Sequence, residues 1–166
     1  MRYFVSILIF LSICLYGGKI DGYIMSCVSG DAQNCDKTGL YYLNHKYGAR
    51  YDVSKSMYYF IKSCQMKNAD GCFHLAQLYD KGKYIKKDSF NSSYYYYKAF
   101  VIYQDKCKHN HARSCLRLGL MYAESNGITK NMQKAKQLFY KSCQLKNQDA
   151  CSLINMLDKK RKFIIK

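Results

Sequence analysis

The stretch KSCQMKNADGC, residues 62–72, returns as KSCQLKNQDAC, residues 141–151, with eight of the eleven positions identical. In both copies, two cysteines enclose seven residues, and the same interval occurs in two further pairs. The four pairs are Cys27/Cys35, Cys64/Cys72, Cys107/Cys115 and Cys143/Cys151. Because the first cysteines of successive pairs are 37, 43 and 36 residues apart, the chain is a repeat with a period typical of solenoid proteins.

The first 18 residues have the pattern of a secretory signal peptide. Arg2 supplies an early charge, residues 3–16 are mostly apolar, and two glycines follow. The apolar run is too short for a typical transmembrane helix. We therefore expect a signal peptide over residues 1–18 and an exported, secreted or periplasmic repeat domain over residues 19–166, without a transmembrane segment once the signal is removed. The sequence allows cleavage either after Cys14 or after the glycine pair.

Export makes the cysteine count informative, because disulfide bonds persist outside the cytosol. Removal of the signal would take away Cys14 and leave the eight paired cysteines, so a local disulfide is predicted in each repeat. Lipid attachment at Cys14 is an alternative, although Ile13 is not the small residue that usually precedes a lipidated cysteine. Zinc is disfavoured because structural zinc sites prefer cysteines two to four residues apart.

Each repeat is expected to form two helices joined by a short polar turn. Apolar residues recur at intervals of three to four residues on both sides of each cysteine pair. Helix A should end near the first cysteine and helix B should begin near the second. The predicted fold is therefore all-α, a solenoid of about four disulfide-bridged αα-hairpins.

Helix boundaries have local signals. Asp52 and Asn131 are candidates to cap the first turn of a following helix A. Gly82 and Gly127 are candidates to end helix B, because glycine adopts the left-handed conformation that closes a helix. The long 43-residue step places an insertion at residues 89–95, which we expect to lengthen the next helix A or its entry loop.

A second motif follows the cysteines. It runs Cys72-x-x-Leu75-Ala76-x-x-Tyr79 in one repeat and Cys115-x-x-Leu118-Gly119-x-x-Tyr122 in another. With the cysteine interval, this motif resembles the Sel1-like repeat superfamily, a relative of the tetratricopeptide repeats, and within it the disulfide-bonded secreted branch, the Helicobacter cysteine-rich protein family. Departures from the pattern are Thr38 in place of the leucine and Ile154-Asn155 in place of Leu-Gly.

The resemblance implies right-handed superhelical packing of the hairpins. It also implies a family whose members are described as penicillin-binding proteins or β-lactamases with peptidoglycan-like ligands, while other relatives are protein-interaction scaffolds. A fold supports several functions, so the resemblance by itself does not choose between binding and catalysis.

The chain offers no recognisable catalytic arrangement. It contains no Ser-x-x-Lys, in which the lysine amine would activate the serine of a β-lactamase. His109 and His111 are the only closely spaced histidines, and no carboxylate adjoins them, so we expect an exposed turn and neither a metal site nor a cofactor. Thiol catalysis is disfavoured because each remaining cysteine has a structural partner.

A ligand groove is predicted from the register of helix A. Positions four and eight before the first cysteine should face the core, so positions three, six and ten should face away from it. The latter are Ser54, Tyr58, Ile61, Tyr97, Val101, Gln104, Gln133, Gln137 and Tyr140. Their chemistry varies between repeats, as expected of a ligand surface. The alternative interpretation is packing between repeats and solvated helix surface.

The chain carries a net charge of +16, which favours anionic partners or surfaces. Nucleic acid is disfavoured because export separates the protein from it and no known reader motif is present. The sequence therefore predicts a protein that binds a peptide, a protein or a cell-wall-derived ligand, including β-lactams. The alternatives are a genuine β-lactamase and a host-directed secreted effector.

Overall fold

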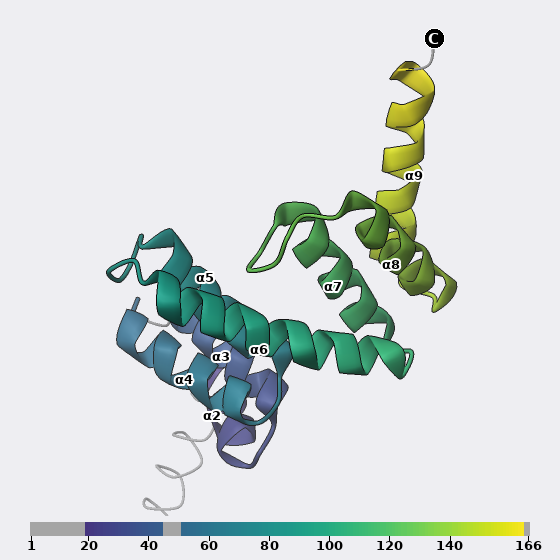
Figure 1. Ribbon diagram of the computed structural model, residues 1–166. Coiled ribbons are helices and arrows are strands. Elements are labelled where there is room, and N and C mark those ends of the chain that lie inside the picture. The colour runs from purple at the N-terminus through teal and green to yellow at the C-terminus, as the bar shows by residue number, and fades with distance from the viewer. Residues whose placement is uncertain (1–18, 45–50, 165–166) are drawn as a thin grey trace, which may run out of the picture. The chain divides into compact units, whose positions relative to one another are not determined.

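The computed structural model describes residues 19–44 and 51–164, and the predicted signal peptide lies outside these residues. The described residues form helices only (Figure 1). The helices are α2 (Lys19–Val28), α3 (Ala32–Asn44), α4 (Val53–Gln65), α5 (Ala69–Lys81), α6 (Ser89–Lys108), α7 (Ala112–Glu124), α8 (Met132–Gln144) and α9 (Gln148–Ile164). The predicted all-α repeat fold is confirmed. None of these helices combines the length and the apolar character that crossing a membrane requires.

The chain divides into two compact units, Met1–Gly71 and Cys72–Lys166. In the first unit, α3 packs against both α2 and α4. In the second unit, α7 packs against α6 and α8, and α8 packs against α9 (Figure 1). Packing of these neighbouring helices within each unit is the arrangement expected when a repeat has too little apolar surface to fold alone.

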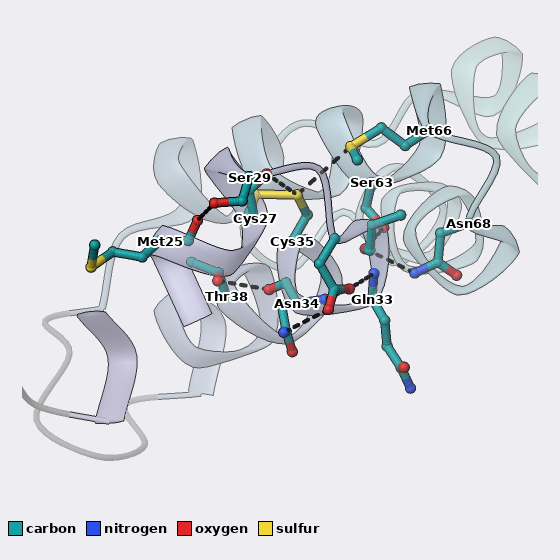
Figure 2. The surroundings of a disulfide bond; sticks show 12 residues. Met25, Cys27, Ser29, Gln33, Asn34, Cys35, Thr38, Ser63, Met66 and Asn68 are labelled. Carbon is teal, nitrogen blue, oxygen red and sulfur yellow. Dashed lines mark hydrogen bonds between the residues drawn. A yellow bond between two sulfur atoms is a disulfide. The ribbon is translucent and has the colours of Figure 1, made fainter. Parts of the chain in front are cut away.

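Disulfide bonds join the two helices of a hairpin, as predicted. The bonds Cys27–Cys35, Cys107–Cys115 and Cys143–Cys151 bring Cα atoms to within 4.6–4.7 Å across a separation of eight residues. Cys64 and Cys72 are disulfide-bonded as well. Figure 2 shows the Cys27–Cys35 bond, with the sulfur of Met66 4.0 Å from the Cys35 Sγ. Each bond lies where one helix ends and the next begins.

The turn between helices A and B has the same conformation in every repeat. The residue three positions after the first cysteine has a positive φ, at Gly30, Lys67, Asn110 and Lys146. Its backbone N–H donates to the carbonyl oxygen of that cysteine over 2.8–3.2 Å. Glycine occupies only one of these positions, although the left-handed region favours it. At the other three positions an L-residue occupies a conformation that L-residues rarely adopt.

The caps of helix A are side-chain oxygens that accept a backbone N–H in the first turn. Asp52 accepts from the N–H of Lys55 and Asn131 from that of Lys134, as predicted. Asp88 caps α6 in the same way, and these hydrogen bonds lower the pKa of its carboxyl group. The insertion adds to the helix and not to a loop, since α6 has 20 residues whereas α4 and α8 each have 13.

The ends of helix B follow the predicted glycines in one case and depart from them in another. Gly82 has φ of 61° directly after α5, as expected. After α7, however, the left-handed residue at the helix end is Ser125, two positions before Gly127. Gly127 lies in the left-handed region as well, with φ of 68°, and a Cβ atom placed on it would clash with the Cβ of Tyr96.

Positions four and eight before the first cysteine form the core, as predicted. They are Ser56 and Phe60 on α4, Ala99 and Tyr103 on α6, and Ala135 and Phe139 on α8, each at most 3% exposed. The aromatic residue of a repeat lies on the glycine of the repeat before it. Within the first unit Phe60 covers Gly39, and within the second Phe139 covers Gly119. The Leu-Gly motif thus leaves room for the next repeat.

Candidate functional site

All but one of the residues predicted to face away from the core are exposed. In the first unit, Ser54 and Tyr58 are exposed and Ile61 is half-buried. In the second unit, six are exposed: Tyr97, Val101, Gln104, Gln133, Gln137 and Tyr140. Because these residues alternate with the buried positions on the same helices, helix A carries a solvent-facing stripe. We call its six members on α6 and α8 the helix A face.

A pocket of about 400 Å³ lies among α6, α7 and α8. It brings together two members of the helix A face, Gln104 and Gln137, although they are 33 positions apart in the sequence. Its other lining residues are Cys107, Lys108, Leu118, Tyr122, Lys134, Leu138 and Lys141. This volume is within the range of small-ligand and side-chain pockets. We call it the lysine pocket.

The lining of the lysine pocket has an apolar part, which we call the floor, and a basic part, which we call the rim. Leu118 is buried, while Tyr122 and Leu138 are partly exposed and supply the remaining apolar area. The Nζ of Lys141 donates a hydrogen bond of 2.9 Å to the carbonyl oxygen of Cys107, so this lysine is held at the C-terminal end of α6. A cation there stabilises the negative end of the helix dipole.

The rest of the helix A face lies outside the pocket. The hydroxyl of Tyr140 donates to the Oδ2 of Asp158 on α9 over 3.2 Å, which directs Tyr140 away from the lysine pocket. Tyr97 and Val101 are 63% and 42% exposed on α6. The structure thus joins two of the predicted groove residues in one cavity and leaves the others as exposed helix surface.

A lysine–tyrosine pair recurs between consecutive repeats. Lys55 lies 5.3 Å from the ring centroid of Tyr42, and Lys134 lies 5.4 Å from that of Tyr122. In each case the lysine is nine positions before the first cysteine and the tyrosine seven positions after the second cysteine of the preceding repeat. An ammonium group at this distance from a ring is attracted to its face. Sequence analysis missed this pair, although its fixed offsets were visible in the repeat.

Tyrosines also cluster next to helix A. In the first unit, Tyr59 stacks on Tyr42 with ring centroids 5.7 Å apart. In the second unit, Tyr95 stacks on Tyr79 at 6.0 Å and meets Tyr94 edge to face at 5.0 Å. Burial and then the neighbouring phenols raise the pKa of both Tyr59 and Tyr95. Both phenols therefore hold their protons more tightly than an exposed tyrosine does.

The histidines at the third hairpin turn cap helices. His109 follows the end of α6, and its Nδ1 lies 2.9 Å from the carbonyl oxygen of Asp105. His111 caps α7 by accepting from the N–H of Ser114. Both residues are exposed at a turn, as predicted. Across residues 19–44 and 51–164, no group of three or more potential ligand side chains is placed to hold a metal ion.

The comparisons with known proteins agree with this geometry. The family described as Sel1 repeat matches residues 37–68, 69–100 and 112–147. Among solved structures, Helicobacter pylori cysteine rich protein B is similar with 29% identity and a TM-score of 0.52, over 81% of this chain and 90% of that one. A Sel1 repeat protein from Oxalobacter formigenes has 22% identity and a TM-score of 0.52, over 79% of this chain. This chain spans half the length of the Oxalobacter protein. A comparison with curated proteins returns no match.

Proposed function

This chain belongs to the Sel1 repeat family, and on that premise we propose that it is an exported protein that binds a protein or peptide on the exposed side of its A helices. The observation that carries the proposal is the helix A face, where aromatic and amide side chains are exposed opposite fully buried positions of the same helices. Tyrosines contribute rigid contact area with a polar tip, and glutamines pair with a peptide backbone.

Export is part of the proposal. Disulfide bonds in every described hairpin are stable in the periplasm or outside the cell and are rare in the cytosol. The cysteine rich protein B of Helicobacter pylori, to which this chain is similar, is described as cysteine-rich too. Cleavage after residue 18 in a secreting host, seen by intact mass, is the expected outcome. Retention of these residues would contradict export through a cleaved signal.

The binding proposal is tested by selecting displayed random peptides on the oxidised protein and measuring their dissociation constants by fluorescence polarisation. Tyr97→Ala and Gln137→Ala should weaken the selected peptides at least about tenfold together, because these exposed residues would lose their contacts. The matched controls, Phe90→Ala and Met156→Ala, remove exposed apolar side chains from α6 and α9 outside the helix A face. Equal weakening by the controls, or none by the helix A variants, would contradict the proposal.

Hydrolysis of β-lactams is the alternative implied by the family resemblance. No observation on the described residues favours it over binding. A chromogenic cephalosporin incubated with oxidised protein tests it directly. Turnover that follows the protein through successive purification columns, and that is lost on unfolding, would replace ligand binding with catalysis as the best-supported function.

A further inference from the structure

We propose that the lysine pocket binds an acidic peptide segment in which a leucine-sized side chain is flanked by glutamate or aspartate. This inference rests on the proposed function and names the chemistry of the partner. The pocket lies within one compact unit and is formed by α6, α7 and α8. Its lining residues carry positive charge and amide groups but no carboxylate.

Charge defines the first requirement. Three lysines, Lys108, Lys134 and Lys141, line a single cavity of about 400 Å³. Lys141 already donates to the carbonyl oxygen of Cys107, so it contributes a fixed positive charge. Lys108 and Lys134 are exposed, and Lys134 would leave the Tyr122 ring, from whose centroid its Nζ lies 5.4 Å, to reach a ligand. Like charges gathered in one cavity repel each other, and a bound anion relieves that repulsion.

The floor defines the second requirement. Leu118 is 4% exposed and lines the pocket together with Leu138 and Tyr122. A small inorganic anion would leave this apolar area in contact with water, whereas an aliphatic side chain would cover it and gain free energy by leaving water. Carboxylate groups on both sides of that side chain would then reach the basic rim.

The glutamines define the third requirement. Gln104 and Gln137 are exposed and lie on opposite helices of the pocket, α6 and α8. Each amide both donates and accepts hydrogen bonds, which matches the alternating N–H and C=O groups of an extended peptide. A peptide therefore uses all three parts of the pocket, the basic rim, the apolar floor and the amides.

The test uses three amidated, fluorescein-labelled peptides of glycine and serine that differ in a central tripeptide: Glu-Leu-Glu, Gln-Leu-Gln or Glu-Ser-Glu. Glu-Leu-Glu should bind tightest. Lys134→Gln and Lys108→Gln should each weaken it by about two- to fivefold, as for a solvent-exposed charge pair, and should leave Gln-Leu-Gln unchanged. Raising the ionic strength from about 0.05 M to about 0.5 M should reduce the difference in affinity between the Glu-Leu-Glu and Gln-Leu-Gln peptides.

The matched control is Lys130→Gln, which removes the same charge from an exposed position outside the pocket lining. Equal effects of Lys130→Gln and Lys134→Gln would overturn the inference, as would Glu-Ser-Glu binding as tightly as Glu-Leu-Glu. Absence of detectable Glu-Leu-Glu binding at a peptide concentration of about 1 mM would also overturn it. If binding of the display-selected peptides were still weakened by the helix A variants, the proposed function would be retained and only the pocket inference rejected. If it were not weakened, the proposed function and the pocket inference would both be rejected.

Discussion

The hydroxyl of Ser142 on α8 donates a hydrogen bond of 2.7 Å to the carbonyl oxygen of Ala112, the first residue of α7. The equivalent serine two cysteine pairs earlier, Ser63, donates over 2.7 Å to the carbonyl oxygen of Ala32, the first residue of α3. Both serines are fully buried and directly precede the first cysteine of their repeat. This bond fixes helix A of one repeat against helix B of the repeat before it.

The two serines should differ in their contribution to stability. Ser142→Ala should lower the free energy of unfolding by about 1–2 kcal/mol, because it removes the buried hydroxyl that donates to the carbonyl oxygen of Ala112. Ser63→Ala should cost less, since the side-chain amide of Asn68 also donates to the Ala32 oxygen over 3.0 Å (Figure 2). Guanidinium unfolding of the oxidised protein, followed by circular dichroism, measures both.

Ser152→Ala is the control for this pair, because Ser152 is an exposed serine on α9. It should change the free energy of unfolding by no more than about 0.5 kcal/mol. Equal losses for Ser63→Ala and Ser142→Ala would show that the Asn68 amide does not replace the missing hydroxyl.

Ser56→Ala should stabilise the protein. Ser56 is fully buried on α4, and its Oγ has no hydrogen-bond partner among the described residues. The equivalent positions eight residues before the first cysteine hold Ala99 and Ala135. Removing an unsatisfied buried hydroxyl should raise the free energy of unfolding by about 1 kcal/mol. Ser54→Ala, two positions away and exposed, should have no effect, and a loss of stability in Ser56→Ala would mean that its hydroxyl is paired.

Gly119→Ala should destabilise the protein by about 1–3 kcal/mol through overpacking. A Cβ atom at Gly119 would lie 2.5 Å from the ring of Phe139, in the core of the next repeat. Combining Gly119→Ala with Phe139→Leu should cost less than the sum of the two single changes, because the smaller side chain makes room for the methyl group. Additive costs would contradict this explanation.

Gly22→Ala is the matched control for overpacking. Nothing lies within 4 Å of a Cβ atom placed on Gly22, which is within α2. Alanine has the higher helix propensity, so this variant should gain up to about 1 kcal/mol. The two glycine substitutions should therefore have opposite signs in the same unfolding experiment.

Ionisation of Tyr96 should lower the free energy of unfolding as the pH rises above about 10. Burial, followed by the charges of Asp80 and Glu124, raises the pKa of Tyr96 to about 12. The folded state therefore favours the neutral phenol. The contribution of Tyr96 is complete below its unfolded pKa of about 10 and is lost as the pH rises from there toward 12.

Denaturant midpoints measured from pH 8 to pH 11 test this effect. Tyr96→Phe should lose less stability than the unsubstituted protein over this range, because phenylalanine has no proton to release. Tyr97→Phe removes a hydroxyl from the exposed neighbouring residue and serves as the control. Parallel pH profiles for the unsubstituted protein and Tyr96→Phe would contradict the assignment.

The parts of the fold that depend on neighbouring residues could be predicted from the sequence. The cysteine interval identified the hairpins, and Asp52 and Asn131 were recognised as caps because a cap bonds within three residues of itself. Alternation along helix A identified the buried and exposed positions. The left-handed conformation of Ser125 was missed because serine, unlike glycine, has no preference for that conformation.

For the residues of the predicted ligand groove, the sequence could predict exposure but not which of them lie close together. The register of a single helix shows which residues face solvent, but it does not show which of them meet across helices. The serine bonds to Ala32 and Ala112 were missed for the same reason, since donor and acceptor are 31 and 30 residues apart. The available signal was the sequence Lys-Ser-Cys, which occurs at both serines, in residues 62–64 and 141–143.

Taken by itself, the amino-acid sequence determined that this protein is a series of disulfide-bridged helical hairpins, because cysteine spacing and helical periodicity act over distances of one or two turns. Only the tertiary structure decided that Lys108, Lys134 and Lys141 share one cavity over Leu118. These residues come from three helices, and their proximity depends on how aromatic side chains such as Phe139 pack against the glycine of the preceding repeat.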